Sequence, residues 1–267
     1  MPGPVALPPL QLPPMRPRVI PVLLIKDGLL YKPQGFRAPR YVGDPRVAVK
    51  IFNDKGADEL VLLDMSATQQ RREPDYALIE EIVSESFMPI GYGGGIRSVD
   101  HAARLASLGV EKAIVNTAAV ENPALIEEIS GLLGASSTVV CIDTKRNLLG
   151  SYKAFTQNGT RATGMDPLAI ARECVRRGAG EIIIQDMKRE GSLAGYNIPL
   201  IKAVADAVDV PVVALGGAGK PEDFRAAVEA GAAAAAAGSM FVFQGPHRAV
   251  LITYPAQDVL DGVFRLD

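Results

Sequence analysis

The chain contains no tryptophan and has little of what builds disulfide frameworks or metal clusters. Its two cysteines, Cys141 and Cys174, lie far apart without a pattern, so we expect free thiols in a reducing cytoplasm. The two histidines, His101 and His247, are also far apart, and we expect neither a metal site nor a cofactor. No apolar run reaches the roughly 18 residues that a membrane span needs. With a formal net charge of −2, the sequence predicts no membrane and no nucleic acid as a partner.

Proline, in contrast, is concentrated at the beginning of the chain. Residues 1–17, MPGPVALPPLQLPPMRP, lack the cationic start and the apolar core of a signal peptide. This composition is typical of a disordered leader, and a proline-rich motif that binds a partner is the alternative. The remaining residues, 18–267, are enough for one large α/β domain or two ordinary ones.

The middle of the chain contains an internal sequence repeat. Matching residues recur 122 positions later: Asp44-Pro45 and Asp166-Pro167, Asp64 and Asp186, Gly94-Gly95 and Gly216-Gly217, Thr117 and Ser239. A constant offset over so many positions indicates an internal duplication. We therefore expect two related halves, at about 18–135 and 136–255.

Eight short apolar runs alternate with amphipathic segments. The apolar runs are Val19–Ile25, Glu59–Met65, Met88–Gly94, Lys112–Ala118, Ser137–Asp143, Glu181–Met187, Pro211–Gly217 and Ala232–Ser239. The amphipathic segments are Pro45–Lys55, Tyr76–Ser86, Val99–Leu108, Pro123–Leu133, Pro167–Arg177, Pro199–Ala207 and Glu222–Ala230. Continuous apolar runs are typical of strands buried on both faces. Eight strand–helix alternations in two equal halves predict an α/β fold, a single (β/α)8 TIM barrel over residues 18–267; a doubly wound open sheet is the weaker alternative.

Three segments differ from this regular alternation. Ala232–Ala237 favours a helix by propensity, but the repeat aligns it with a strand, and we expect a strand. The segment from Lys26 to Gly43 is long and basic, which is typical of a lid or of a disordered loop. Tyr152–Thr156 and Thr160–Thr163 flank a turn at Asn158-Gly159, and they predict a β-hairpin inserted after the fifth strand.

Glycines and small polar residues stand where several strands are expected to end. Backbone N–H groups at such turns, beside helix N-termini, can hold a phosphate. One set, called the first anion site below, is Gly95, Asn116 and Thr117. The set in the other half, called the second anion site, is Gly191, Gly217, Gly238 and Ser239. Glycines that only make tight turns are the alternative, but two copies in register favour an elongated substrate with a phosphate at each end.

Aspartates at expected strand ends are candidates for chemistry. Asp143 ends an apolar strand, where a partly desolvated carboxylate can act as a general base. A salt bridge to Lys145 or Arg146 is the alternative for Asp143. Asp64 and Asp186 are a pair related by the duplication, and each either binds substrate or caps a loop.

The motifs GADELVLLD, YGGGIRS, KAIVNTAAVENP, IDTKR, REGSLAGY and GGAGKPEDF resemble the HisF family, the cyclase subunit of imidazole glycerol phosphate synthase. The resemblance extends from Arg18 to about Phe243. It implies a (β/α)8 barrel of two halves that binds a bis-phosphate ribonucleotide. It also implies a glutaminase (HisH-like) subunit docked at the opposite, N-terminal face, from which ammonia travels through the barrel.

The resemblance also implies roles for particular residues. The family's catalytic positions match Asp143, as general base, and Lys32, as the lysine of a mobile loop. The two anion sites match its phosphate sites. The charged residues around its ammonia entrance, called the charged ring below, match Arg18, Glu59, Lys112 and Glu181. Its docking face matches at Asp58 and Glu111.

The centre of the pocket departs from the family pattern. The family's other essential aspartate falls at Leu24, which cannot transfer a proton, and losing a positioned acid typically costs about 10²–10⁴-fold in rate. Positions near the middle of the family's substrate are also changed, at Gln185, Asp186 and Leu215. The usual aspartate before the glycine after strand six is Glu190. The two phosphate sites match the family, whereas the residues between them do not, and this pattern indicates a changed substrate.

The sequence around Leu24, with the phrases YVGDP and REPDY, resembles divergent HisF-like proteins associated with glycosyl amidation in bacterial surface-polysaccharide pathways. Our hypothesis is a subunit that accepts ammonia from a glutaminase and uses or relays it on a phosphorylated sugar-type substrate. One alternative is an authentic cyclase of histidine biosynthesis, in which Asp64 or Asp186 replaces the missing acid. A second is a non-catalytic ammonia conduit that activates its glutaminase.

Overall fold

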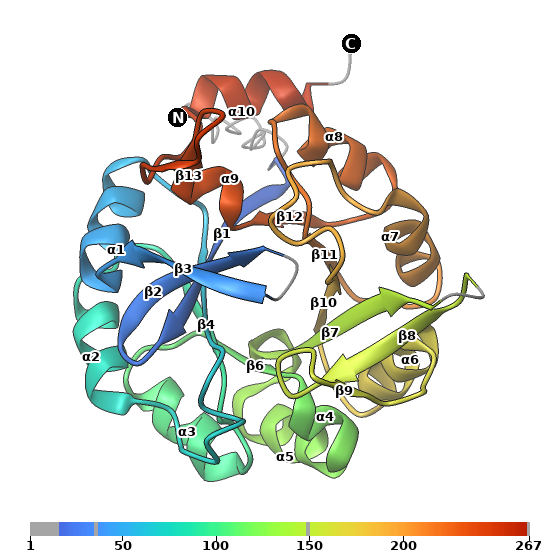
Figure 1. Ribbon diagram of the computed structural model, residues 1–267. Helices are drawn as coiled ribbons and strands as arrows, with labels where there is room; N and C mark the ends of the chain where they lie inside the picture. The colour runs from blue at the N-terminus through green and yellow to red at the C-terminus, as the bar shows by residue number, and fades with distance from the viewer. Residues whose placement is uncertain (1–15, 35–36, 148–149, 266–267) are drawn as a thin grey trace, which may run out of the picture.

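The structure is a computed structural model that describes residues 16–34, 37–147 and 150–265, so residues 1–15 of the expected leader lie outside the described residues. Eight parallel strands form a closed barrel surrounded by helices (Figure 1). The barrel strands are β1 (Arg18–Lys26), β4 (Leu60–Asp64), β5 (Ile90–Gly93), β6 (Lys112–Val115), β7 (Thr138–Arg146), β10 (Glu181–Asp186), β11 (Val212–Leu215) and β12 (Ala234–Ala237). Because β12 pairs with β1 and β10 pairs with β7, the eight parallel strands form a closed ring, and the predicted TIM barrel is confirmed.

Helices follow the strands around the outside. They are α1 (Pro45–Asp54), α2 (Tyr76–Ser84), α3 (Val99–Ser107), α4 (Thr117–Glu121), α5 (Ala124–Leu133), α6 (Pro167–Arg176), α7 (Ile198–Ala205), α8 (Glu222–Glu229), α9 (Ser239–Val242) and α10 (Gln257–Phe264). Asp44 and Asp166 cap α1 and α6 with their side chains, and a proline follows each cap. The repeated Asp-Pro therefore begins equivalent helices in the two halves. Among the described residues, no helix is long and apolar enough to cross a membrane.

Apolar side chains form two separate cores. The larger core lies between the strands and the helices and includes Phe52 and Phe224. The smaller one, called the inner core below, fills the barrel and includes Ile20, Ile114 and Ile183. Because both faces of each barrel strand are buried, the strands have continuous apolar sequences.

The alanine run forms a strand, as the repeat predicts. β12 lies between β1 and β11, and all four of its alanines are buried. Ala234 and Ala236 pack in the inner core, whereas Ala235 and Ala237 pack in the outer one. Pairing on both sides therefore overrides the helix propensity of alanine.

Two β-hairpins extend barrel strands beyond the carboxyl ends. The segment from Lys26 to Gly43, expected to be a lid or a disordered loop, forms the antiparallel strands β2 (Leu29–Gln34) and β3 (Arg37–Gly43), with β2 paired to β1. This hairpin lies across the mouth of the barrel (Figure 1). A second hairpin, β8 (Tyr152–Thr156) and β9 (Arg161–Ala162), continues from β7 and confirms the predicted insertion.

Candidate active site

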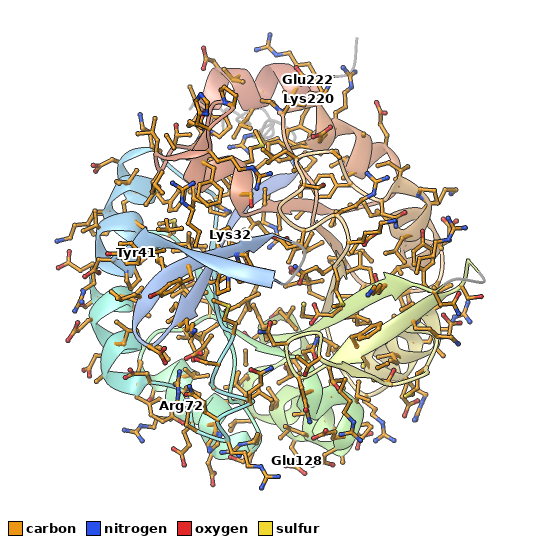
Figure 2. The ribbon with its side chains drawn as sticks, viewed as in Figure 1. Lys32, Tyr41, Arg72, Glu128, Lys220 and Glu222 are labelled. Carbon is orange, nitrogen blue, oxygen red and sulfur yellow. The ribbon has the colours of Figure 1, made fainter. Side chains whose placement is uncertain are left out.

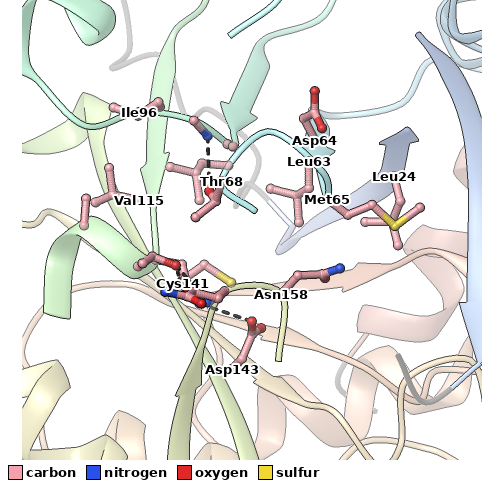
Figure 3. A pocket seen from close by; sticks show the side chains of 18 of the residues that line it. Leu24, Leu63, Asp64, Met65, Thr68, Ile96, Val115, Cys141, Asp143 and Asn158 are labelled. Carbon is pink, nitrogen blue, oxygen red and sulfur yellow. Dashed lines mark hydrogen bonds between the residues drawn. The ribbon is translucent and has the colours of Figure 1, made fainter. Parts of the chain in front are cut away.

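A cavity of about 530 Å³ opens at the carboxyl ends of the barrel strands (Figure 3). This is the end of a TIM barrel at which active sites are built. The lining residues used below are Leu24, Asp64, Gly95, Asn116, Thr117, Glu121, Cys141, Asp143, Gln185 and Glu190. Within the described part of the chain, no group of three or more His, Cys, Asp or Glu side chains could hold a metal ion.

The first anion site lies along the wall of this cavity. Gly95 has a φ of +74°, and a Cβ there would stand 2.8 Å from the carbonyl oxygen of Arg72, so the position requires glycine. Asn116 and Thr117 begin α4, whose N-terminus has no side-chain cap. The Thr117 hydroxyl accepts a hydrogen bond from the backbone of Gln157 at 2.9 Å. The structure thus brings the three predicted residues to one cavity, beside an uncapped helix N-terminus.

The second anion site does not line this cavity. Its four residues are Gly191, Gly217, Gly238 and Ser239. Ser239 begins α9 and is buried, and its hydroxyl has no hydrogen-bond partner in the described structure. The Lys32 ammonium lies so close to Gly238 that any side chain there would collide with it. Arg248 donates a hydrogen bond of 2.6 Å to the carbonyl oxygen of Gly191. Lys32 and Arg248 therefore cover the second anion site.

Asp143, on β7, lines the cavity, and 6% of its surface is exposed. Its carboxylate accepts a hydrogen bond from Nδ2 of Asn116 at 3.2 Å. Burial, and secondly the charge of Glu190, raise the pKa of Asp143 to about 7. Lys145 and Arg146 are exposed, Arg146 donates instead to the carbonyl oxygen of Gly150, and among the described residues neither forms the salt bridge considered as the alternative. A carboxyl group with a pKa near neutrality can both donate and accept a proton.

The two aspartates related by the duplication are held by their own loops. Asp64 accepts hydrogen bonds from backbone N–H groups of the following loop and forms an ion pair with Arg72 at 2.5 Å. Asp186 accepts from its own loop in the same way, and from Nδ2 of Asn197 at 2.5 Å. Asp64 lines the cavity and Asp186 does not. These contacts favour the loop-capping alternative for both residues.

A buried ion pair closes the centre of the site, and the sequence does not predict it. Nζ of Lys32, on β2, lies 2.5 Å from Oε1 of Glu190, and both side chains are 3% exposed. Gln185 donates a hydrogen bond from Nε2 to Oε2 of Glu190 at 3.2 Å. Figure 2 shows Lys32 over the middle of the barrel. The one signal in the sequence is a glutamate in place of the family's usual aspartate, but no pattern connects it to Lys32.

The four residues of the charged ring meet at the opposite end of the barrel. Lys112 places Nζ 2.9 Å from Oε2 of both Glu59 and Glu181. Arg18 bridges the same two carboxylates, with a distance of 3.1 Å to Glu181. Both glutamates are almost fully buried. Four charges drawn from distant parts of the sequence thus form one closed network beneath the inner core.

The two docking-face residues differ in their surroundings. Asp58 accepts two hydrogen bonds of 2.8 Å from Arg16 and one of 2.8 Å from the backbone of Val19. Arg16 also approaches Asp261 of α10, at 3.3 Å. Glu111 is exposed and lines a smaller cavity together with Lys112 of the charged ring. Asp58 therefore holds the beginning of the described chain against the end of the barrel, whereas Glu111 is accessible to a partner.

Comparison with known proteins places this geometry in a family. Residues 18–247, which include all eight barrel strands, match the family described as "Histidine biosynthesis protein". A Leptospira interrogans protein with the provisional name imidazole glycerol phosphate synthase subunit HisF is 43% identical over 252 residues, covering 94% of this chain and 99% of the relative. A Pseudomonas aeruginosa protein, provisionally named subunit hisF2 of the same synthase, is 46% identical over 248 residues, covering 92% and 99%.

A third relative, whose name is not provisional, has a similar level of identity to this chain. The imidazole glycerol phosphate synthase subunit HisF of Thermococcus gammatolerans is 43% identical over 225 residues, which cover 84% of this chain and 88% of the relative. Both the cavity and the charged ring fall inside the matched residues.

Proposed function

Because this chain belongs to the HisF family, we propose that it accepts ammonia from a glutaminase (HisH-like) partner and uses or relays it on a phosphorylated sugar-type substrate in glycosyl amidation. One observation carries the proposal. The cavity is lined by Gly95, Asn116 and Thr117, the residues predicted for the first anion site, and by the buried Asp143, but it has the apolar Leu24 where the resemblance implies the family's other acid. Figure 3 shows Leu24 and Asp143 on different walls of the cavity.

The charged ring supports a route for ammonia. The ring and the cavity lie at opposite ends of the barrel, with the inner core between them. Neutral ammonia crosses an apolar interior at much lower cost than ammonium, because a buried charge loses its hydration. Arg18 and Lys112 each bridge Glu59 and Glu181, which closes this end. In the proposal, docking of the glutaminase on the surface around Glu111 rearranges these ion pairs and admits ammonia.

The first anion site supports a phosphorylated substrate. Gly95, Asn116 and Thr117 line the same cavity as Asp143, so a phosphate there leaves the rest of the molecule beside the carboxyl group. The unpartnered hydroxyl of Ser239 supports a second phosphate at the other end. The ammonium of Lys32 lies beside Gly238 of the same site, where it can supply a positive charge for that phosphate.

Isotope transfer in the complex tests the proposal. The chain, purified with its cognate glutaminase, receives glutamine labelled with ¹⁵N in the side-chain amide. Phosphorylated sugars and the family's bis-phosphate ribonucleotide are supplied in parallel reactions. We expect ¹⁵N in a phosphorylated sugar product, and we expect Asp143→Asn to abolish the transfer.

The alternatives predict different results in the same experiment. Cyclisation of the ribonucleotide at ordinary rates would establish the histidine-biosynthesis alternative, although the loop contacts of Asp64 and Asp186 count against either one as the replacement acid. Glutamine hydrolysis without a labelled product, unchanged by Asp143→Asn and lost on substitution of Lys112, would establish the ammonia conduit.

A further inference from the structure

Four acidic side chains line the cavity, and two of them, Asp143 and Glu190, are almost fully buried on its wall without being bonded, among the described residues, to their own loop or to an exposed partner. Asp64 is bound by its own loop, and Glu121 stands at the rim and forms an ion pair with Arg161. We propose that Glu190 acts with Asp143 as the second proton-transfer group, in place of the acid that is absent at position 24. This inference rests on the proposed function.

The positions of the side chains connect the two carboxyl groups. Asp143 and Gln185 are register partners on the adjacent strands β7 and β10, and both line the cavity. Gln185 donates a hydrogen bond of 3.2 Å to Oε2 of Glu190. Glu190 therefore lies one side chain away from Asp143, on the wall of the same cavity.

The surroundings of the two carboxyl groups differ, which gives them different roles. The ammonium of Lys32 balances the charge of Glu190 at 2.5 Å. Among the described residues Asp143 is bonded to the neutral amide of Asn116 and to no cation, and burial, followed by the charge of Glu190, raises its pKa to about 7. Two acids in one site with unlike environments are the usual basis for an acid and a base at the same pH. In this inference Glu190 is the base and Asp143 is the acid, which differs from the role of general base that the family resemblance implies for Asp143.

The proton balance of ammonia addition fits this pair. The nitrogen of ammonia forms a bond to a carbonyl carbon of the substrate, and the C–O π bond breaks. Glu190 removes one proton from the nitrogen, and Asp143 gives one proton to the oxygen, so the total charge does not change. Transfer of the proton from Glu190 to Asp143 restores the starting state. No oxidant, metal or further reactant is consumed.

Titration of the protein alone tests the pairing. The pKa of Asp143 is measured by carboxyl ¹³C NMR in the wild type, in Glu190→Gln and in Glu128→Gln, a matched change on the exposed surface of α5. We expect the pKa of Asp143 to fall in Glu190→Gln, because one cause of its elevation is removed, and to stay unchanged in Glu128→Gln. The double variant Lys32→Met/Glu190→Gln, which buries no unpaired charge, gives the same test if Glu190→Gln folds poorly. An unchanged pKa in both Glu190 variants overturns the inference.

Turnover tests the proton transfer itself. In the complex with ¹⁵N-labelled glutamine, we expect Glu190→Gln to lower kcat about 10²–10⁴-fold, the usual loss of a positioned acid or base. Glu190→Asp should recover part of this loss, and Glu190→Gln should remove one limb of the pH–rate profile. A purely structural Glu190 would leave the shape of that profile unchanged, and turnover of Glu190→Gln equal to that of Glu128→Gln overturns the inference.

The failures of the two ideas are distinguishable. If the wild-type complex labels no phosphorylated sugar but the titration shows the expected fall, the proposed function is wrong and the carboxyl pair stands. If the wild-type complex labels its product and Glu190→Gln does so equally well, the carboxyl pair is wrong and the proposed function stands.

Discussion

Asp143 makes the free energy of unfolding depend on pH. Its pKa is raised to about 7, first by burial and then by the charge of Glu190, whereas an unfolded aspartate has a pKa of about 3.9. The folded protein therefore binds this proton more tightly than the unfolded chain does. The stabilising contribution is fully present below about pH 4 and is lost as the pH rises towards and through 7.

We expect Asp143→Asn to raise the free energy of unfolding at pH 8 by up to about 4 kcal/mol, because three pKa units correspond to roughly that energy. The gain should be much smaller at pH 5, where the wild-type side chain is mostly neutral in the folded state. The asparagine oxygen can still accept the hydrogen bond from Asn116. Urea denaturation at both pH values measures the difference, with the exposed change Asp206→Asn as a control. Equal effects of Asp143→Asn at the two pH values would contradict the raised pKa.

Single residues were predicted from the sequence to different degrees. The position of Asp143 follows from an apolar run that ends in an acid, and the structure buries that acid in the cavity. The loop bonds of Asp64 and Asp186 depend on backbone geometry that the sequence does not display. Glu190 depends on Lys32, which reaches it only because the β2–β3 hairpin folds over the mouth. Long-range pairs of this kind cannot be predicted from spacing.

At the level of elements, β12 shows how packing overrides propensity. Its alanines face the inner and outer cores alternately, and each is at most 3% exposed. Ala233, just before the strand, is exposed. The two positions have the same residue type and nearly the same place in the chain, so they form a matched pair for substitution.

We expect Ala235→Leu to lower the free energy of unfolding by about 1–3 kcal/mol, because the added carbons have no space in a packed core. Ala233→Leu should change it by less than about 0.5 kcal/mol, as is usual for surface positions. Urea denaturation of both variants measures the difference. Equal stability of the two variants would show that β12 is not packed on both sides.

The barrel elements were predictable because burial on both faces gives strands a continuous apolar sequence, and because caps such as Asp44 and Asp166 begin helices. The β2–β3 hairpin was not, since its sequence is basic, contains Pro33 and does not alternate clearly. It forms because β1 continues beyond the barrel and offers a pairing edge from Leu24 to Lys26. Such an edge depends on the assembled barrel and not on local sequence.

At the scale of the whole molecule, the cavity and the charged ring lie at opposite ends of one barrel. Closure of the barrel was predictable, because a constant offset makes two halves of four strands each, and β12 then meets β1. The duplication does not predict whether the two ends of the barrel, with the cavity and the charged ring, are functionally connected. The charged ring draws Arg18, Glu59, Lys112 and Glu181 from both halves, so its integrity depends on the complete fold.

Lys112→Met tests whether the charged ring couples the two ends. Methionine keeps an unbranched side chain but removes both ion pairs of Lys112, which leaves Arg18 alone between Glu59 and Glu181. We expect the rate supported by glutamine to fall relative to the rate supported by ammonium salts by roughly 5- to 150-fold, the range of coupling free energies between linked sites. Ammonium salts supply ammonia from solution directly to the cavity, so that rate should remain near the wild-type value.

Lys202→Met on the exposed face of α7 removes a lysine of the same length without touching the ring, and it should leave both rates unchanged. An unchanged ratio in Lys112→Met would show that ammonia does not pass this end of the barrel. Loss of both rates together would indicate damage to the fold, which urea denaturation of the same variant detects. A lower glutamine rate with an intact ammonium rate, intact stability and unchanged glutamine hydrolysis indicates a change in passage between the partner and the cavity, whereas a parallel loss of glutamine hydrolysis indicates a change in docking or in glutaminase activity.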